Sequence, residues 1–224
     1  MRIIFRFKFC LGRHIQALGN FTTIRALYSC IQNLIDGGYI SRRKHLYSVP
    51  FLYTLTHKGR MLLGVNKRED RIIVERITHD IYVLDTVIYC VKKYGISLRD
   101  IESEKELHIK DGFGTRKHHP DFVFSACGKR YAVEIELNPK ARERMEKNIK
   151  DNYLNYDGQI WLTNTPKVFS LLQDFMNKYD LKIGRLEEVI EFVKKHNQHY
   201  SNSSNNKPLY GYAENNSEYK NKQR

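Results

Sequence analysis

Residues 118–140 read HHPDFVFSACGKRYAVEIELNPK and contain the part of the sequence that decides the fold. Apolar or small residues fill 122–126, and apolar residues alternate with others over 131–137, so two strands are predicted. Gly128-Lys129 between them is typical of a two-residue hairpin turn. The sequence therefore predicts a β-hairpin that runs straight into a helix.

Three acids are predicted to share one face of this hairpin. A turn at Gly128-Lys129 places Asp121 across the ladder from Glu136 and diagonally from Glu134. Like charges opposed in a sheet are destabilising and raise one another's pKa, so a cation is expected among them. Carboxylate oxygens suit Mg²⁺ or Mn²⁺. The alternative is that the two glutamates line the solvated face of an amphipathic hairpin.

The spacing of these acids resembles the core of the PD-(D/E)xK (restriction-endonuclease-like) nucleases. In that family an acid opens the second strand of a hairpin-containing sheet, and a second acid and a lysine lie on the next strand, before a helix. The resemblance implies that Asp121 and Glu134 bind Mg²⁺ or Mn²⁺ against the scissile phosphate. Glu136 stands at the usual lysine position, where it would complete the site or act as base. Lys140, in the first turn of the next helix, would supply the positive charge.

Composition bounds the class of protein. The chain has 224 residues, 41% of them hydrophobic, and a formal net charge of +13. Residues 1–70 carry 12 basic against 3 acidic residues, as expected of a module that meets a polyanion. The widely spaced cysteines predict reduced thiols in a cytoplasmic protein, and the N-terminal apolar run is too short and too charged for a membrane segment.

Residues 1–66 are predicted to form a winged helix-turn-helix domain that binds double-stranded DNA. The expected elements are an apolar strand over 1–10, helices over 11–18, 24–35 and 56–63, a strand from 39, a basic turn at 41–44 and a returning strand at 49–55. The residues expected to contact DNA are Thr22, Thr23 and Arg25 at the start of the second helix, and Arg42, Arg43 and Lys44 on the wing. The alternative is a small helical domain that binds another protein.

Residues 67–196 are predicted to form the nuclease-like domain, a mixed sheet flanked by helices in an α/β (α+β) fold. Around the hairpin, the expected elements are a helix over 69–94, a strand over 106–110, a helix capped by Asn138, a strand over 159–163, a helix over 166–179, a short strand over 181–183 and a helix over 186–196. Residues 197–224 are rich in Asn, Ser and Lys, and a disordered polar tail is predicted there.

Several residues outside the hairpin are candidates for a supporting role. Asp80 and Asp85 flank the apolar stripe of the predicted helix over 69–94, and either could add an acid to the site. His79 falls on the far face of that helix, where a surface or interdomain position is expected. The basic run Arg116-Lys117-His118-His119 approaches Asp121 and is expected to contact DNA or solvent, its two histidines pointing to opposite faces.

The whole arrangement resembles plasmid mobilisation proteins of the MobC type and the related replication-relaxation proteins. The segments that carry this resemblance are HDIYVLD at 79–85, HPDFVF at 119–124 and AVEIELNPKARER at 132–144. It implies a relaxase-like endonuclease that nicks double-stranded or locally melted DNA at a transfer or replication origin, together with accessory mobilisation proteins. Two alternatives remain open: an inactive DNA-binding accessory or replication-initiation factor, and a transposon- or resolvase-type nuclease.

Overall fold

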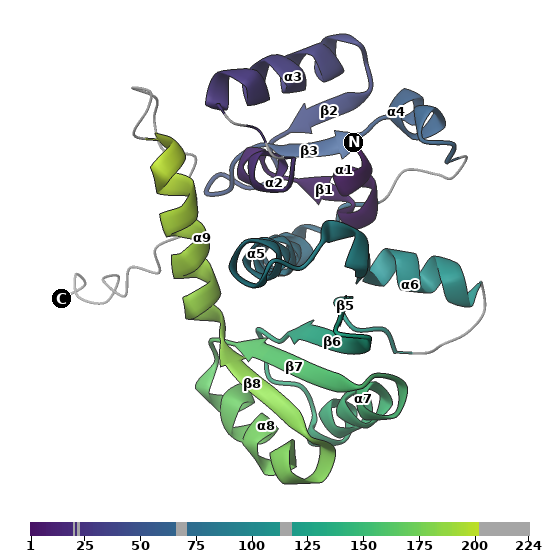
Figure 1. Ribbon diagram of the computed structural model, residues 1–224, viewed down its shortest axis with the longest axis vertical. Helices are drawn as coiled ribbons and strands as arrows, with labels where there is room; N and C mark the ends of the chain where they lie inside the picture. Colours follow the sequence, from purple (N-terminus) through teal and green to yellow (C-terminus); the bar gives the residue numbers. More distant parts are fainter. Residues whose placement is uncertain (20, 22, 66–70, 113–117, 202–224) are drawn as a thin grey trace, which may run out of the picture.

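The computed structural model describes residues 1–19, 21, 23–65, 71–112 and 118–201, with the side chains of 197–201 left out. Thr22, Arg116, Lys117 and the tail from 202 therefore lie outside the described residues. The described part is a mixed α/β fold that contains a three-stranded and a five-stranded sheet (Figure 1).

The N-terminal part is built around the smaller sheet, in the order β1-β3-β2 with antiparallel neighbours. Its elements are α1 (Arg2–Phe7), β1 (Phe9–Cys10), α2 (Gly12–Leu18), α3 (Ile24–Asp36), β2 (Ile40–Arg43), β3 (Leu52–Leu55) and α4 (His57–Leu62). The Thr23 hydroxyl caps α3 by accepting from the Ala26 N–H at 3.1 Å. The predicted order of helix, helix, two-stranded ribbon and helix is confirmed.

Two predictions for this part were wrong. The apolar start of the chain is mostly the helix α1, with only Phe9 and Cys10 in a strand. A short apolar run does not separate strand from helix by pattern, and the burial of Ile4 and Phe7, three residues apart, fits one face of a helix. The predicted basic turn is also displaced, because Arg42 and Arg43 belong to β2 and pair with Tyr53 and Leu52.

The second part contains the larger sheet, in the order β4-β5-β6-β7-β8. Its elements are η1 (Val74–Arg76), α5 (Ile77–Tyr94), η2 (Leu98–Asp100), β4 (Ile101–Ser103), α6 (Glu104–Asp111), β5 (Phe122–Ala126), β6 (Lys129–Ile135), α7 (Arg142–Asn155), β7 (Gly158–Thr163), α8 (Pro166–Tyr179), β8 (Leu181–Arg185) and α9 (Leu186–Ser201). Strands β4 to β6 are antiparallel, whereas β6 to β8 are parallel. The predicted mixed sheet flanked by helices is confirmed.

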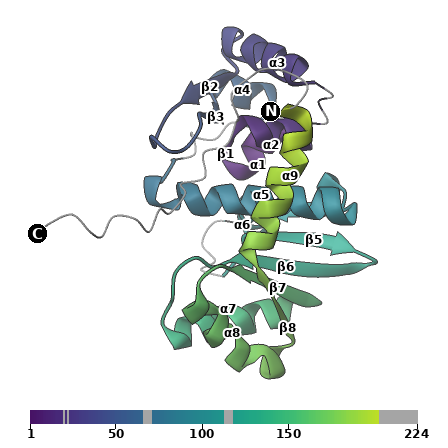
Figure 2. The same cartoon turned by 90° about the vertical axis from the view of Figure 1, so that its left-hand side faces the viewer.

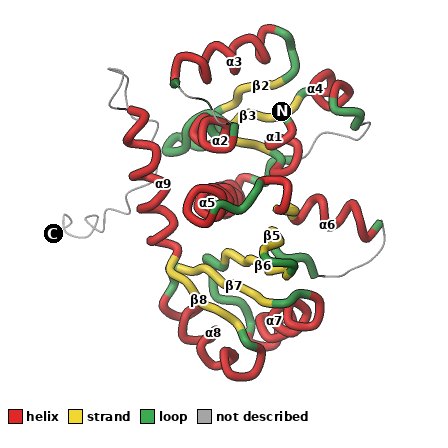
Figure 3. Tube along the Cα trace, viewed as in Figure 1, coloured by secondary structure: helices red, strands yellow, loops and turns green. Residues whose placement is uncertain are grey.

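Helices cover both faces of this sheet (Figures 1 and 3). On one face, α7 and α8 pack over Trp161 through Met145 and Leu172. On the other face lie α5 and α9, and Figure 2 shows α5 between the sheet and the N-terminal part. Buried residues of both sheets and of α5 form one continuous apolar cluster, which includes Tyr53 and Val133. The predicted domain division after residue 66 stays a prediction, and residues 66–70 lie outside the described residues.

Several element boundaries differ from the predicted ones. The predicted strand over 106–110 is wrong, because Ser103 and Glu106 form a capping box that starts α6, and the strand β4 precedes them. Helix α5 begins at Ile77 rather than at residue 69, and α7 begins at Arg142 rather than beside Asn138. Helix α9 extends to Ser201, five residues into the predicted tail. Strand β7 and helix α8 are confirmed within one residue.

The register of the hairpin is two residues from the predicted one. Ala126 pairs with Lys129, so the turn residues are Cys127 and Gly128, with φ of +51° and +74°. A two-residue turn with both central residues at positive φ favours glycine in this second position. The shift brings Asp121 level with Glu134 instead of Glu136. Since two residues are a full side-chain repeat, every side chain stays on its predicted face.

Candidate active site

The three acids predicted from the sequence lie together at the end of the hairpin opposite its turn. Asp121 immediately precedes β5, Glu134 lies in β6, and Glu136 follows the last residue of β6. Glu134 and Glu136 are each only 6% exposed. Carboxylates are rarely this buried without polar partners. Each of the three acids has such partners, and they differ from one acid to the next.

Asp121 is held as an anion by two donors. Its Oδ2 atom accepts a hydrogen bond from the Ile135 backbone N–H at 2.8 Å and lies 3.3 Å from Nε2 of His79. Burial opposes ionisation of Asp121, but the His79 charge and these hydrogen bonds outweigh it and lower its pKa. The same carboxylate raises the pKa of His79, against the effect of burial. The pair is therefore most stable as carboxylate and imidazolium.

His79, a candidate for a supporting role, contacts this site, so its predicted surface or interdomain position on the far face of the helix was wrong. Besides Asp121, its ring nitrogens contact the Asp80 carboxylate at 3.2 Å and the Ile135 carbonyl at 3.1 Å. The error arose because α5 packs on both sides. Thr86, on the same side of the helix as His79, lines a hollow against the five-stranded sheet. The apolar stripe instead begins with Ile77, which packs in the N-terminal core.

Glu134 has two partners of its own. Its Oε1 atom lies 2.5 Å from Nε2 of His118 and accepts from the Asn152 side-chain amide at 3.0 Å. Burial and the nearby charge of Asp121 raise the pKa of Glu134, while these two hydrogen bonds lower it in part. Asn152 is not among the site residues predicted from the sequence. The sequence indicates its buried position only through helical spacing, because Asn152 follows the buried Met145 and Ile149 on the apolar face of α7.

Glu136 forms an ion pair with Lys140. Lys140 does not lie in the first turn of a helix, as predicted, but in the loop before α7. Its charge nevertheless reaches the site. Burial and the Lys140 charge act to lower the pKa of His118, but the hydrogen bond and charge of Glu134 outweigh them, so this pKa is raised. The predicted closeness of Lys140 to the acids is therefore confirmed, and its helical position is wrong.

The two auxiliary aspartates lie in different places. Asp80 is at the rim, 4.0 Å from Arg76, where a hollow of about 30 Å³ is lined by Asp80, Asp121 and Lys8. Asp85 lies away from the site, because it is fully buried against Arg13 and His14 of the N-terminal part. Asp85 is thus a structural residue in the contact between α2 and α5.

The two histidines of the basic run point to different partners, as predicted, but the expectation that both contact DNA or solvent was wrong, because His119 is buried. His118 points to Glu134, whereas the buried His119 lies 3.4 Å from Asp111 and edge-on to the His108 ring. Of the residues predicted to bind DNA, Thr23 and Arg25 are exposed at the start of α3, and Arg42, Arg43 and Lys44 are exposed at the end of β2 and just after it.

The donor types fit a hard divalent cation. Two neighbouring acids, one of which raises the pKa of the other, offer the oxygen ligands that Mg²⁺ and Mn²⁺ prefer. Within the described ranges, no group of three or more His, Cys, Asp and Glu side chains is arranged to hold a metal ion. Mg²⁺ is commonly bound by only one or two carboxylates together with waters and substrate phosphates, so a two-acid site is consistent with both observations.

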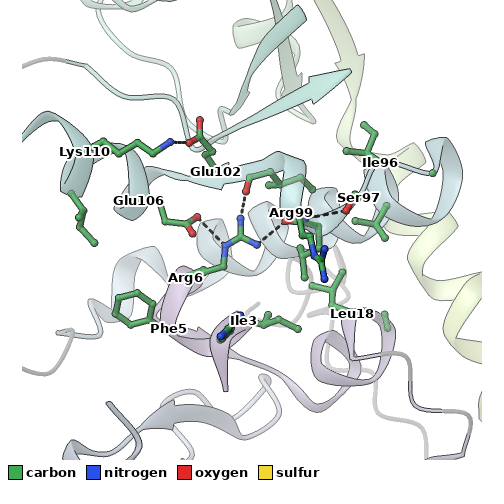
Figure 4. Close-up of a pocket in the computed structure, with 17 residues that line it drawn as sticks. Ile3, Phe5, Arg6, Leu18, Ile96, Ser97, Arg99, Glu102, Glu106 and Lys110 are labelled. Atoms are coloured by element: carbon green, nitrogen blue, oxygen red, sulfur yellow. Dashed lines mark hydrogen bonds and ion pairs between the residues drawn. The ribbon is translucent and has the colours of Figure 1, made fainter. Parts of the chain in front are cut away.

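A hollow of about 920 Å³ lies elsewhere, between α1 and the segment from η2 to α6 (Figure 4). Arg6 in its wall donates to the Glu106 carboxylate at 2.9 Å, to the Leu98 carbonyl at 2.8 Å and to the Ile101 carbonyl. These bonds attach α1 to the second part of the chain. Arg6 is therefore structural, and the hollow is distinct from the carboxylate site.

Comparison of the chain with protein-family models, with curated proteins and with solved structures finds no match. In the part of the chain that the structure describes, each helix is too short or too polar to cross a membrane.

Proposed function

We propose that this protein is a metal-dependent DNA endonuclease of the relaxase-like kind, which recognises and nicks a plasmid transfer or replication origin. The observation that carries the proposal is the gathering of Asp121, Glu134 and Glu136 at one end of two paired strands. Glu134 and Glu136 are buried, and the pKa of Asp121 is lowered whereas that of Glu134 is raised. Perturbed acids of this kind are typical of functional sites.

The order of the elements supports the nuclease interpretation. Asp121 opens β5, which is the second strand of the five-stranded sheet, and Glu134 lies on the next strand, before α7. This is the arrangement that the resemblance to PD-(D/E)xK nucleases implies. Asp80, from the helix that precedes the sheet, adds a further acid at the rim of the site.

The N-terminal part supports a DNA-binding role. The succession of α2, α3 and the ribbon of β2 and β3 agrees with a winged helix-turn-helix. Arg25 on α3 and Arg42 and Arg43 on the ribbon are exposed, as phosphate-contacting side chains must be. Most of the net positive charge of the chain comes from residues 1–70, which include this part.

In the proposed mechanism, Asp121 and Glu134 would hold Mg²⁺ or Mn²⁺, which supplies charge stabilisation and an activated water when bound. His79 keeps Asp121 ionised, so this acid is ready to act as a ligand at neutral pH. His118 and Asn152 orient the Glu134 carboxylate and favour its charged form. Glu136 accepts the proton of the attacking water, and Lys140 beside it offsets negative charge at the phosphate.

The second candidate is a DNA-binding accessory or initiation factor without nuclease activity. Position 136 favours it, because a glutamate stands where the resembled nucleases have a lysine. The ion pairs also favour it, since each acid already has a cationic partner from the chain itself: His79, His118 and Lys140. A nuclease of the transposon or resolvase type would instead cut supercoiled plasmids that lack any origin.

The test is nicking of supercoiled plasmid DNA with Mg²⁺ or Mn²⁺ by the full chain and by Asp121→Asn and Glu134→Gln. Glu143→Gln, which alters an exposed acid of α7, is the matched control. We expect both site variants to lose more than about a hundredfold in rate while gel shifts show unchanged DNA binding. An inactive natural protein that still binds DNA would replace this proposal with the accessory-factor role. Site variants that cut as fast as the natural protein would show that Asp121 and Glu134 do not form the active site.

A further inference from the structure

The loop between β2 and β3 exposes two aromatic rings. Tyr47 is 95% exposed and Phe51 is 44% exposed. Both lie within the eight residues that connect Arg43 at the end of β2 to Leu52 at the start of β3. Aromatic side chains bury a large apolar surface in a folded chain or an interface. Two exposed rings on one short loop therefore indicate a partner.

Each ring is accompanied by a cation. The Lys44 ammonium lies 5.0 Å from the centroid of the Tyr47 ring, and the Arg42 guanidinium lies 4.9 Å from that of Phe51. A flat apolar surface next to a positive charge matches a nucleotide, which has a flat base and a negative phosphate. It does not match an acidic peptide, which offers charge without a ring to stack, or a neutral apolar partner, which would leave the cations unused.

This surface continues toward α3. A hollow of about 570 Å³ between α3 and the ribbon is lined by Arg25, Tyr28 and Arg42 among others, and the Tyr28 ring is also exposed. Arg42 therefore borders both the hollow and the Phe51 ring. A nucleic acid that contacts the start of α3 would pass along this hollow to the loop that carries Tyr47.

We propose that Tyr47 and Phe51 stack on unpaired bases, so that the partner of this loop is a junction between duplex and single-stranded DNA. The inference rests on the proposed function, which makes DNA the partner. It adds a contact with the bases to the phosphate contacts of Arg42 and Lys44. The faces of bases inside a duplex are covered by their neighbours, so a ring can stack only where a base has left the stack.

The test compares a blunt duplex with the same duplex carrying an unpaired thymine tail, using fluorescence anisotropy and the full chain. We expect the natural protein to prefer the tailed DNA. Tyr47→Ala should weaken that binding about tenfold, or about 1.4 kcal/mol, and change blunt-duplex binding by less than about twofold. Tyr47→Phe keeps the ring and should retain the preference. A 2-aminopurine at the first unpaired position should be quenched by the natural protein and not by Tyr47→Ala.

The possible failures are distinguishable. If the natural protein binds both DNAs equally, or if Tyr47→Ala and Phe51→Ala bind the tailed DNA as tightly as the natural protein does, the stacking proposal is wrong and DNA binding itself stands. If the natural protein binds neither DNA, the proposed function fails together with this inference, and a protein partner becomes the account of the exposed rings. Unchanged circular dichroism of the variants, expected from the exposure of Tyr47, excludes misfolding.

Discussion

Asp85→Asn should strongly destabilise the protein, because Asp85 is the anion of a buried network between α2 and α5. Its carboxylate accepts two hydrogen bonds from the Arg13 guanidinium, with N···O distances of 2.9 and 3.2 Å. One carboxylate oxygen also lies 3.1 Å from Nε2 of His14. Arg13 is 2% exposed and the other two side chains are fully buried. Asparagine keeps the shape and removes the charge that balances Arg13. Removal of one partner of a buried ion pair costs about 3–5 kcal/mol.

The assay is unfolding by urea and by heat, followed by far-ultraviolet circular dichroism and by fluorescence of Trp161, the single tryptophan, which is buried in the five-stranded sheet. At roughly 2–4 °C per kcal/mol for a chain of this size, the melting temperature should fall by about 6–20 °C. Asp174→Asn is the control, because it breaks an ion pair with Arg142 whose side chains are about half exposed, and should cost less than about 1 kcal/mol. A loss below about 1 kcal/mol for Asp85→Asn would refute the reasoning.

The remaining predictions concern pH, catalysis and salt. The pKa of His14 falls from 6.5 to about 4, mainly because the ring is buried, and its Nδ1 accepts from the Leu11 N–H, so only the neutral ring fits. Between these two pKa values the unfolded chain therefore binds a proton that the folded chain does not. The free energy of unfolding should fall by about 3 kcal/mol from pH 6.5 to pH 4. His14→Gln, which has no ring to protonate, should not show this fall. Lys140→Ala should slow nicking about tenfold to a hundredfold with unchanged gel shifts, and equal rates would remove Lys140 from the mechanism. Arg43→Ala should weaken binding to all DNA sequences alike and reduce the slope of log affinity against log salt by about 1, whereas an unchanged slope would place Arg43 away from the phosphates.

The sequence was informative where a pattern has one physical solution. Strict alternation over residues 131–137 assigned Glu134 and Val133 to opposite faces, and the structure confirms it, because Glu134 contacts α7 and Val133 lies in the cluster with α5 residues. The predicted start of the second helix at residue 24 is also confirmed, and the Thr23 hydroxyl caps α3 there. Local chemistry of this kind depends on few neighbours.

The predictions that were wrong concern features that contacts between distant parts of the chain determine. The turn register depended on whether Cys127 would take a positive φ, which its sequence neighbours do not reveal. His79 was assigned to the outside because one apolar stripe was assumed to define one buried face, and α5 is buried on two. Asp85 looked like a rim acid until Arg13, seventy-two residues away, was brought against it by the fold. The spacing of Ser103 and Glu106 is that of a capping box, a local signal in the sequence that favours a helix over the predicted strand at 106–110.

The most direct test of the central claim is binding of Mn²⁺ to the full chain, followed by electron paramagnetic resonance. The account predicts saturable binding by the natural protein and by Glu143→Gln, and its loss in Asp121→Asn and Glu134→Gln. Equal Mn²⁺ binding by all four proteins, or none by the natural protein, would contradict a metal site at the end of the β5–β6 hairpin.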